Sequence, residues 1–473
     1  MKKLSLSVLL IFIFLVNSYA QILKVSDNHR YLVKKDNSPF LWLGDTAWEL
    51  FHKLNREEAT EYLENRAKKG FSVIQAVVLA EIEGLRSPNP YGEVPFKDLD
   101  PTQPNEAYFK HVDFIVNKAQ ELGLVIGMLP TWGDKIYSEN PGAGPIVFNK
   151  ENARVYGKFL GKRYKDKSIV WILGGDRNIA NNEVLDIWRA MADGLKEGDG
   201  GKHLITFHPR GGTSSSKMLH NEEWLDFNMY QSGHHQRFIN VYDYAKNDWE
   251  QQPVKLYVDG EPAYEDIAVK FWEYVDFSKP SKKRVPEGVL NNDGTIRDKS
   301  HFKDGFFTDY DIRVHAYWNL LSGACGYTYG NNAVWQMFKK GGEFAIPCLF
   351  DWQESLDRPG AFDIQNVRKI LEPVFYKLLP DNSIISGQNP GGQNHICAAA
   401  SSDFSIALIY LSTGQPVKTE MGKFQNRVKA SWFNPRNGFK NKIGVFRNSG
   451  IFEFTPPSSG IGDDWLLVLE TKQ

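Results

Sequence analysis

Two carboxylates follow apolar runs of the chain at positions where catalytic groups can be held. Asp176 comes after residues 169–173 and two glycines, and Glu261 comes after residues 255–258. Cleavage of a glycosidic bond needs one carboxylic acid to protonate the leaving oxygen and one carboxylate to attack or to activate water. The two residues are therefore candidates for acid–base chemistry on a sugar bond.

Each carboxylate also has a structural alternative. Asp176 could cap the helix that follows it, because Asp is a favoured N-cap residue. Glu261 could form an ion pair with a nearby arginine. Asp259 precedes Glu261 by two residues and so should share its side of the strand, where it could orient Glu261 or compete with it as a candidate.

Polar and aromatic residues at or just after the other apolar runs form a candidate substrate-binding set. Indoles offer flat apolar faces for sugar rings, and amides offer hydrogen bonds for hydroxyl groups. The set comprises Asp45, Trp48, Gln75, Trp132, His208, Tyr230, Gln231, Asn331 and Trp335. Asp45 could instead cap the helix that carries Trp48, and His208 is better suited to hydrogen bonding in a pocket than to acid catalysis. The set predicts an oligosaccharide substrate.

Eight short apolar runs could place these residues. They lack polar alternation, which is typical of parallel strands buried on both faces. They cover residues 40–44, 71–79, 124–129, 169–173, 204–207, 227–230, 255–258 and 326–329. Helical patterns lie between them at residues 56–69, 105–122, 149–164, 183–196 and 309–322. Asn55 is a plausible N-cap for the first of these helices.

Strands that alternate with helices over about 300 residues predict an α/β protein, and eight strands predict a closed (β/α)8 TIM barrel. The active site of such a barrel lies at the carboxyl ends of its strands, so Asp176 and Glu261 should face each other across the mouth. An open doubly wound sheet is the competing fold. It would more usually carry a glycine-rich fingerprint after the first strand, and residues 44–48 do not form one.

After residue 380 the sequence changes to short alternating segments separated by turn signals, which predicts a small antiparallel β-sandwich domain. We expect the barrel at residues 21–380 and the sandwich at residues 383–473. Acidic residues of the sandwich should lie on its surface and away from catalysis; they are Asp403, Glu420, Asp463 and Asp464.

Residues 1–20 have the features of a secretory signal. Lys2 and Lys3 precede an apolar run at residues 4–16, and small and polar residues lead to a cleavage site after Ala20. The run is shorter than the roughly 20 residues that a membrane span needs. An uncleaved anchor is the alternative. The sequence thus predicts export to the periplasm or the exterior.

Composition excludes several functions. The 473 residues are 42% hydrophobic and carry a net charge of −1, so there is no basic surplus for nucleic acid. Cys325, Cys348 and Cys397 are too few for a disulfide scaffold. His234 and His235 are adjacent rather than spaced as metal ligands, and neither a phosphate-loop nor a zinc-protease motif is present. We expect no metal and no cofactor, and the sequence leaves the oligomeric state open.

Three stretches resemble the apiosidase-like glycoside hydrolase family: residues 43–48 (LGDTAW), 171–176 (WILGGD) and 259–265 (DGEPAYE). The C-terminal segment is similar to a small β domain named for collagen binding in a collagenase. The resemblance implies a (β/α)8 barrel in which Asp176 is the acid/base and Glu261 the nucleophile. It also implies activity on apiose in the pectin rhamnogalacturonan II.

We therefore expect an exported, exo-acting, retaining apiosidase. Two alternatives stay open at this point. One is another retaining barrel glycosidase that acts on mannosides or arabinosides of plant glycans. The other is a barrel that only binds glycan, against which the carboxylate pair argues, because a pure binder has no use for an acid opposite a nucleophile. No protease motif supports collagen degradation.

Overall fold

The computed structural model describes residues 20–138 and 144–471. The expected signal peptide thus lies outside the described residues except for Ala20. A three-stranded antiparallel sheet comes first, formed by β1 (Lys24–Val25), β2 (Leu32–Val33) and β3 (Pro39–Phe40). Within the described ranges no helix is both long and apolar enough to cross a membrane.

Eight parallel strands form the barrel, and each corresponds to one of the predicted apolar runs. They are β4 (Trp42–Thr46), β5 (Val73–Val77), β6 (Val125–Leu129), β7 (Ile169–Gly174), β8 (Ile205–His208), β10 (Asn228–Gln231), β11 (Tyr257–Asp259) and β12 (Gly326–Tyr329). The last strand pairs with the first in parallel, with Gly326 opposite Trp42. Every residue of these strands is buried. This explains why the runs lack polar alternation.

The barrel is almost closed, and single hydrogen bonds from backbone and side chain bridge the gap between β8 and β10. The Asp226 amide donates a hydrogen bond of 2.9 Å to the Ile205 carbonyl. The Thr206 hydroxyl donates one of 2.7 Å to the Phe227 carbonyl. A short strand, β9 (Thr213–Ser214), pairs antiparallel with β10 at this edge. The predicted TIM barrel is confirmed.

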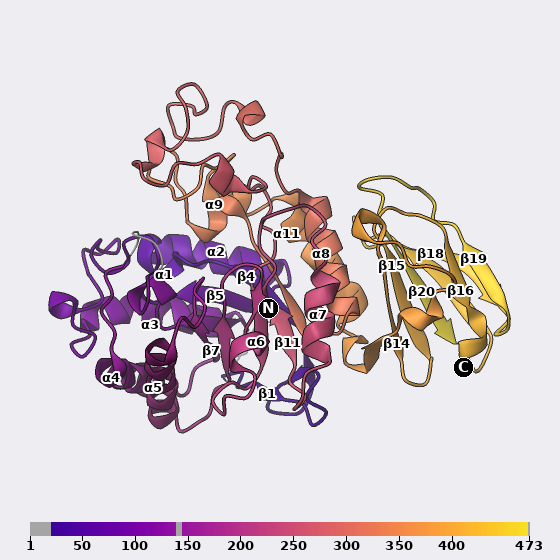
Figure 1. Cartoon of the computed structure of the whole chain (residues 1–473), viewed down its shortest axis with the longest axis horizontal. Coiled ribbons are helices and arrows are strands. Elements are labelled where there is room, and N and C mark those ends of the chain that lie inside the picture. Colours follow the sequence, from indigo (N-terminus) through magenta and orange to yellow (C-terminus); the bar gives the residue numbers. More distant parts are fainter. Residues whose placement is uncertain (1–19, 139–143, 472–473) are drawn as a thin grey trace, which may run out of the picture.

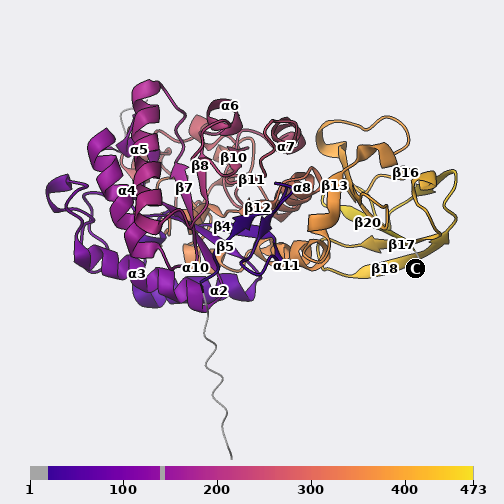
Figure 2. The ribbon, with the colours of Figure 1, turned by 90° about the horizontal axis from the view of Figure 1, so that it is seen from below.

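Helices surround the strands (Figures 1 and 2). The longer ones are α2 (Arg56–Lys68), α3 (Glu106–Glu121), α4 (Lys150–Tyr164), α5 (Asn182–Asp199), α7 (Val241–Trp249), α8 (Asp309–Leu321) and α11 (Pro359–Leu371). Single turns form α1 (Leu50–Lys53), α6 (Ser216–Leu219), α9 (Asn332–Trp335) and α10 (Trp352–Ser355). Asn55 caps α2 as predicted, in a capping box with Glu58.

The connection from β11 to α8 is long and contains three 3-10 helices, η3 (Phe271–Glu273), η4 (Ser281–Lys283) and η5 (Lys299–His301). It has a small apolar core that includes Val275, Val285 and Phe302. Further 3-10 helices are η1 (Lys97–Leu99), η2 (Gly133–Lys135), η6 (Phe375–Lys377), η7 (Asn382–Ile384), η8 (Gly392–Asn394) and η9 (Met421–Lys423).

The C-terminal domain is a small antiparallel β-sandwich. Its larger sheet has the order β13 (Leu378–Pro380), β14 (Ile396–Ser401), β15 (Ile406–Leu411), β20 (Trp465–Thr471), β17 (Val428–Phe433) and β18 (Lys440–Phe446). The smaller sheet pairs β16 (Val417–Glu420) with β19 (Ile451–Phe454). Both sheets share one core. The larger sheet already begins at Leu378, inside the range expected for the barrel.

The sandwich packs on α8 and α11 of the barrel (Figure 1). Asp464 is fully buried at this interface, where its carboxylate lies 3.1 Å from Arg313 Nε of α8. The Tyr317 ring stacks on Tyr410 with centroids 4.6 Å apart. The expectation that Asp464 lies on the surface is wrong, because the barrel covers this part of the sandwich.

Candidate active site

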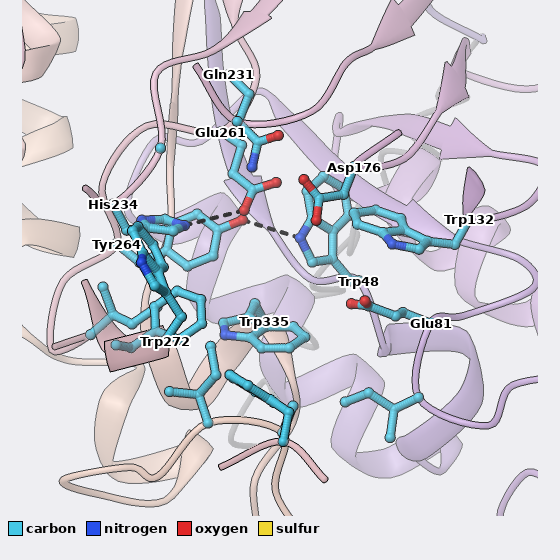
Figure 3. A pocket seen from close by; sticks show the side chains of 18 of the residues that line it. Trp48, Glu81, Trp132, Asp176, Gln231, His234, Glu261, Tyr264, Trp272 and Trp335 are labelled. Carbon is cyan, nitrogen blue, oxygen red and sulfur yellow. Dashed lines mark hydrogen bonds and ion pairs between the residues drawn. The ribbon is translucent and has the colours of Figure 1, made fainter. Parts of the chain in front are cut away.

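A cavity of about 1270 Å³ opens at the carboxyl ends of the barrel strands. Six of the eleven predicted site residues line it, and they come from six different strand ends (Figure 3). They are Trp48, Trp132, Asp176, Gln231, Glu261 and Trp335. The barrel therefore brings together residues that are as far as 287 positions apart in sequence.

A tight turn of three residues with positive φ presents Asp176 to the cavity. Gly174, Gly175 and Asp176 have φ of 88°, 111° and 52°. A Cβ at Gly174 would lie 2.2 Å from the His208 carbonyl, and one at Gly175 would lie 2.7 Å from the Trp132 ring. Only glycine fits there. The helix that follows is capped by Asn181, so Asp176 is not its N-cap.

Glu261 lies across the cavity from Asp176, with its side chain only 10% exposed. His234 Nε2 lies at 3.2 Å from Glu261 Oε1, within hydrogen-bonding distance. His208 Nε2 lies 3.1 Å from Oε2. Within the described part of the chain, the basic groups that contact Glu261 are thus imidazoles, and not the arginine that the alternative required.

His208 is held in the orientation that Glu261 needs. It is fully buried and does not line the cavity, so the prediction that it contacts substrate is not supported. The backbone amide of Asp176 donates a hydrogen bond to His208 Nδ1 at 3.4 Å. With Nδ1 accepting, the proton of a neutral imidazole resides on Nε2, which faces Glu261. The same imidazole therefore contacts the Glu261 carboxylate on one side and the backbone of Asp176 on the other.

The protein shifts the pKa values of the two carboxyl groups in opposite directions. Burial, followed by the negative charge of Glu261, raises the pKa of Asp176 to about 6. The Asp176 side chain is 38% exposed, but it faces the cavity rather than the outer surface. Burial also acts to raise the pKa of Glu261, but His208 and His234 outweigh it, so the pKa falls below its usual range. An acid thus faces a charged carboxylate.

Aromatic rings form the walls around this pair. Trp48 and Trp132 lie with ring centroids 5.2 Å apart, and Trp48 Nε1 donates a hydrogen bond of 3.1 Å to the Tyr264 hydroxyl. Gln231 is 5% exposed, and its Oε1 has no hydrogen-bond partner among the described residues. Such an acceptor at a cavity wall is available to a sugar hydroxyl.

Four other predicted substrate contacts also lie outside the cavity. Asp45 is fully buried and accepts hydrogen bonds of 2.6 Å from Tyr62 and from Arg66 of α2, so it neither touches the cavity nor caps a helix. Its role is to join β4 to α2. Gln75 is also fully buried, and its amide donates a hydrogen bond of 2.7 Å to the carbonyl of Gly260. It therefore supports the backbone next to Glu261.

Tyr230 and Asn331 are fully buried, do not line the cavity and contact other parts of the protein. The Tyr230 hydroxyl hydrogen-bonds to Asn319, and the Tyr230 ring stacks on Tyr244. Asn331 caps α9, and its side-chain amide donates a hydrogen bond of 3.1 Å to the Asp266 carboxylate. Tyr230 precedes Gln231 by one position, so its side chain points to the other side of β10. This one-residue difference could be known only once the strand end was fixed.

Three further carboxylates at or after the ends of barrel strands have partners within the protein. Asp134 forms an ion pair with Lys135 Nζ at 2.8 Å, and Asp259 accepts a hydrogen bond of 2.7 Å from the Ser232 hydroxyl. Glu265 accepts a hydrogen bond of 2.7 Å from the Tyr329 hydroxyl. None of these three carboxylates is among the cavity-lining residues.

The predicted site set does not include His234, Tyr264 or Glu81, all of which line the cavity. His234 follows β10 by three residues, and this position just after a strand end is the sequence signal that identifies it. No cluster of His, Cys, Asp and Glu in the described residues has the arrangement of a metal site.

A barrel with an acid and a charged carboxylate among indole rings is the site of a glycoside hydrolase. The "Apiosidase-like, catalytic domain" family matches residues 26–377, and the chain belongs to this family. Residues 379–470 match the family described as "Putative collagen-binding domain of a collagenase".

Solved structures agree with this assignment. A protein titled "Glycoside hydrolase" is similar over 96% of this chain and 97% of its own, with 30% identity and a TM-score of 0.81. A family 5 glycoside hydrolase from Bacteroides vulgatus is 28% identical over 95% and 92% of the two chains, with a TM-score of 0.80. None of the curated proteins matches this chain.

Proposed function

We propose that this glycoside hydrolase is an exported, retaining, exo-acting apiosidase that removes apiose from side chains of pectic rhamnogalacturonan II. The observation that carries the mechanism is the opposite pKa shift of Asp176 and Glu261 in one cavity. The family match supports the choice of sugar. The apolar run at residues 4–16 after two lysines supports export.

In the first step, Glu261 attacks the anomeric carbon as a carboxylate while Asp176 gives its proton to the leaving glycosidic oxygen. The C–O bond to the aglycone breaks, and a glycosyl ester forms on Glu261. The ester removes the negative charge that helps to raise the pKa of Asp176. Asp176 consequently becomes a stronger acid and remains deprotonated after the transfer.

In the second step, Asp176 takes a proton from water as the water attacks the same carbon. The ester bond breaks, Glu261 returns as a carboxylate, and the sugar leaves with its original configuration. His208 and His234 favour the charged form of Glu261, which serves the attack and also makes Glu261 a better leaving group. Gln231 and the indoles hold the ring during both steps.

The test is incubation of the protein with a panel of pectic oligosaccharides that carry terminal apiose, arabinose or mannose. Released monosaccharides are identified, and proton NMR during early turnover records the anomer formed first. We expect free apiose with retained configuration. Release of arabinose or mannose instead would favour the other retaining glycosidase, and binding without release would favour a glycan-binding barrel. Formation of the opposite anomer would make Glu261 a general base.

Export is tested separately. The protein recovered from outside the cytoplasm of the producing bacterium should begin after Ala20. A chain that keeps residues 1–20 and sediments with membranes would instead indicate an uncleaved anchor.

A further inference from the structure

A third carboxyl group, that of Glu81, lines the cavity but has no part in the mechanism above. Glu81 lies in the loop after β5, and its side chain enters from the side of Asp176. In Figure 3 its carboxyl group points toward the centre of the cavity, between Trp132 and Trp335. It is thus placed near the catalytic acid and not at the outer surface.

Two buried charged side chains hold the backbone on either side of Glu81. Lys135 Nζ donates a hydrogen bond of 2.9 Å to the carbonyl of Ala80. Glu49 Oε1 accepts one of 3.0 Å from the amide of Ile82. Lys135 and Glu49 are each fully buried. Buried polar groups that fix a backbone position in this way limit the movement of the side chain between them.

Each of these two side chains also has a second polar partner. Lys135 pairs with Asp134 at 2.8 Å, and Glu49 Oε2 lies 2.8 Å from His52 Nδ1. The two contacts lie after different strands, β6 and β4, and both support the loop that follows β5.

The Glu81 carboxyl group itself has no hydrogen-bond or ion-pair partner within residues 20–138 and 144–471, in contrast to Asp45, Asp134, Asp259 and Glu265. Its charged neighbours are Asp176 and Asp134 on the negative side and Lys135 and Arg177 on the positive side. Burial and the two carboxylates raise the pKa of Glu81 to about 8. At neutral pH it is therefore mainly a neutral acid, which can both donate and accept a hydrogen bond.

We propose that Glu81 is a substrate-binding residue whose carboxyl group hydrogen-bonds a hydroxyl of the sugar held between Asp176 and Glu261. Gln231 enters beside Glu261 and Glu81 enters beside Asp176, so the sugar ring lies between two fixed polar groups (Figure 3). A site that hydrogen-bonds a hydroxyl rejects a sugar without it, because its own polar group is then left unpaired. Glu81 thereby contributes to the choice of sugar.

The inference rests on the proposed glycosidase function, and the test separates the two. Glu81→Gln and Glu81→Leu have nearly the same volume and both remove the charge, but only Gln can hydrogen-bond. The control is Glu121→Gln, the same chemical change at the exposed end of α3, on the opposite end of the barrel. The substrate is 4-nitrophenyl apioside, and kcat/KM is measured together with the thermal midpoint.

We expect Glu81→Leu to lower kcat/KM at least ~100-fold. Glu81→Gln should keep a kcat/KM at least ~10-fold higher than that of Glu81→Leu, because Gln can still form the hydrogen bond. The control Glu121→Gln should stay within about twofold of the wild type. A folded Glu81→Leu protein within about threefold of the wild type would overturn the proposal. Equal loss in the Gln and Leu variants would also overturn it, because charge or volume would then explain the effect.

If Glu81→Leu does not fold, Glu81→Gln and the wild type are compared on a series of monodeoxy 4-nitrophenyl apiosides. The loss caused by Gln should then be smaller for the analogue that lacks the bonded hydroxyl, whereas equal loss on every analogue contradicts the proposal. A wild-type protein inactive on the apioside overturns the choice of sugar and not the role of Glu81. The same comparison is then made on the aryl glycoside of the sugar that the panel identifies.

Discussion

Two clusters of carboxyl groups in the described part of the chain can be compared, and of these two only the one at the barrel mouth faces open space. At the barrel mouth, Asp176, Glu261 and Glu81 face a cavity. Between the barrel and the sandwich, Asp309, Asp363 and Asp464 surround Arg313, with N–O distances of 2.6, 2.7 and 3.1 Å. Both clusters join elements that are distant in sequence.

A perturbed pKa does not by itself tell the two clusters apart. Burial raises the pKa of Asp363 to about 7 despite the neighbouring Arg313, and burial raises that of Asp176 to about 6. The difference lies in the partners and in access. A guanidinium keeps its charge at every physiological pH and holds its carboxylates in fixed pairs. The mouth cluster has titratable imidazoles and open space beside it, which a reacting substrate can fill.

The largest expected effect at the mouth cluster comes from Glu261→Gln, which removes the attacking group while nearly preserving its shape. We expect kcat to fall by at least ~10³, because several kcal/mol of transition-state stabilisation are lost. The free energy of unfolding should change little. Steady-state kinetics and denaturant titration measure both. A variant with more than about a tenth of the wild-type activity would remove Glu261 from the mechanism.

At the interface cluster, Asp464→Asn should reverse this pattern. Removing one partner of a buried ion pair leaves charge uncompensated, so we expect a loss of about 3 kcal/mol in the free energy of unfolding. Under conditions where the variant is folded, kcat should stay within about threefold. The matched control is Asp463→Asn, whose side chain is 42% exposed and which should change stability by less than about 0.5 kcal/mol. Equal stability of the two variants would contradict the assignment.

The pH profile sharpens the contrast, since only the mouth cluster should appear in it. The active form needs Asp176 protonated and Glu261 charged, so kcat/KM should fall as pH rises through about 6, the pKa of Asp176. Asp176→Asn should abolish this limb. The substitution should also slow the hydrolysis of substrates with poor leaving groups at least ~10-fold more than that of substrates that release 4-nitrophenolate. A good leaving group departs without a proton, so its release does not need Asp176. A limb that persists in the variant would belong to another residue.

His234→Asn tests the titratable partner of Glu261. Loss of the imidazole removes one of the groups that lower the pKa of Glu261. The acid limb of kcat/KM should therefore move to higher pH, and activity at the optimum should fall about tenfold. His29→Asn, at an exposed position near β2, provides the control. An unmoved acid limb would show that His208 alone sets the charge of Glu261.

The smallest effect is expected from the acids of the sandwich that are not buried at its interface with the barrel. Asp403→Asn, Glu420→Gln and Asp463→Asn combined should leave kcat within about twofold, since the sandwich that carries them packs on α8 and α11 (Figure 1) and none of the three lines the cavity. A folded triple variant without turnover would mean that the active site extends into the sandwich.

Local patterns predicted most of the fold. Strand runs buried on both faces and helix caps such as Asn55 depend on neighbouring residues alone, and they are confirmed. Strand β14 has only a weak local signal, because its run Ile396–Ser401 is rich in alanine, which has little preference for strands. Helix α11 lies outside the predicted helical ranges, although Pro359 stands at its first turn.

The sequence by itself determined the eight strands, their order along the chain and the carboxylates that follow the fourth and seventh of them. Only the tertiary structure decided which polar groups remain free. Asp45 and Asp464 have the same chemistry as Asp176, but buried arginines already pair with them. His208 contacts Glu261 but does not line the cavity, and Glu81 reaches the cavity from a loop whose backbone is held by hydrogen bonds with Lys135 and Glu49. The physical reason is that a buried charge takes its partner from segments far away in sequence, and no local pattern records which partner it finds.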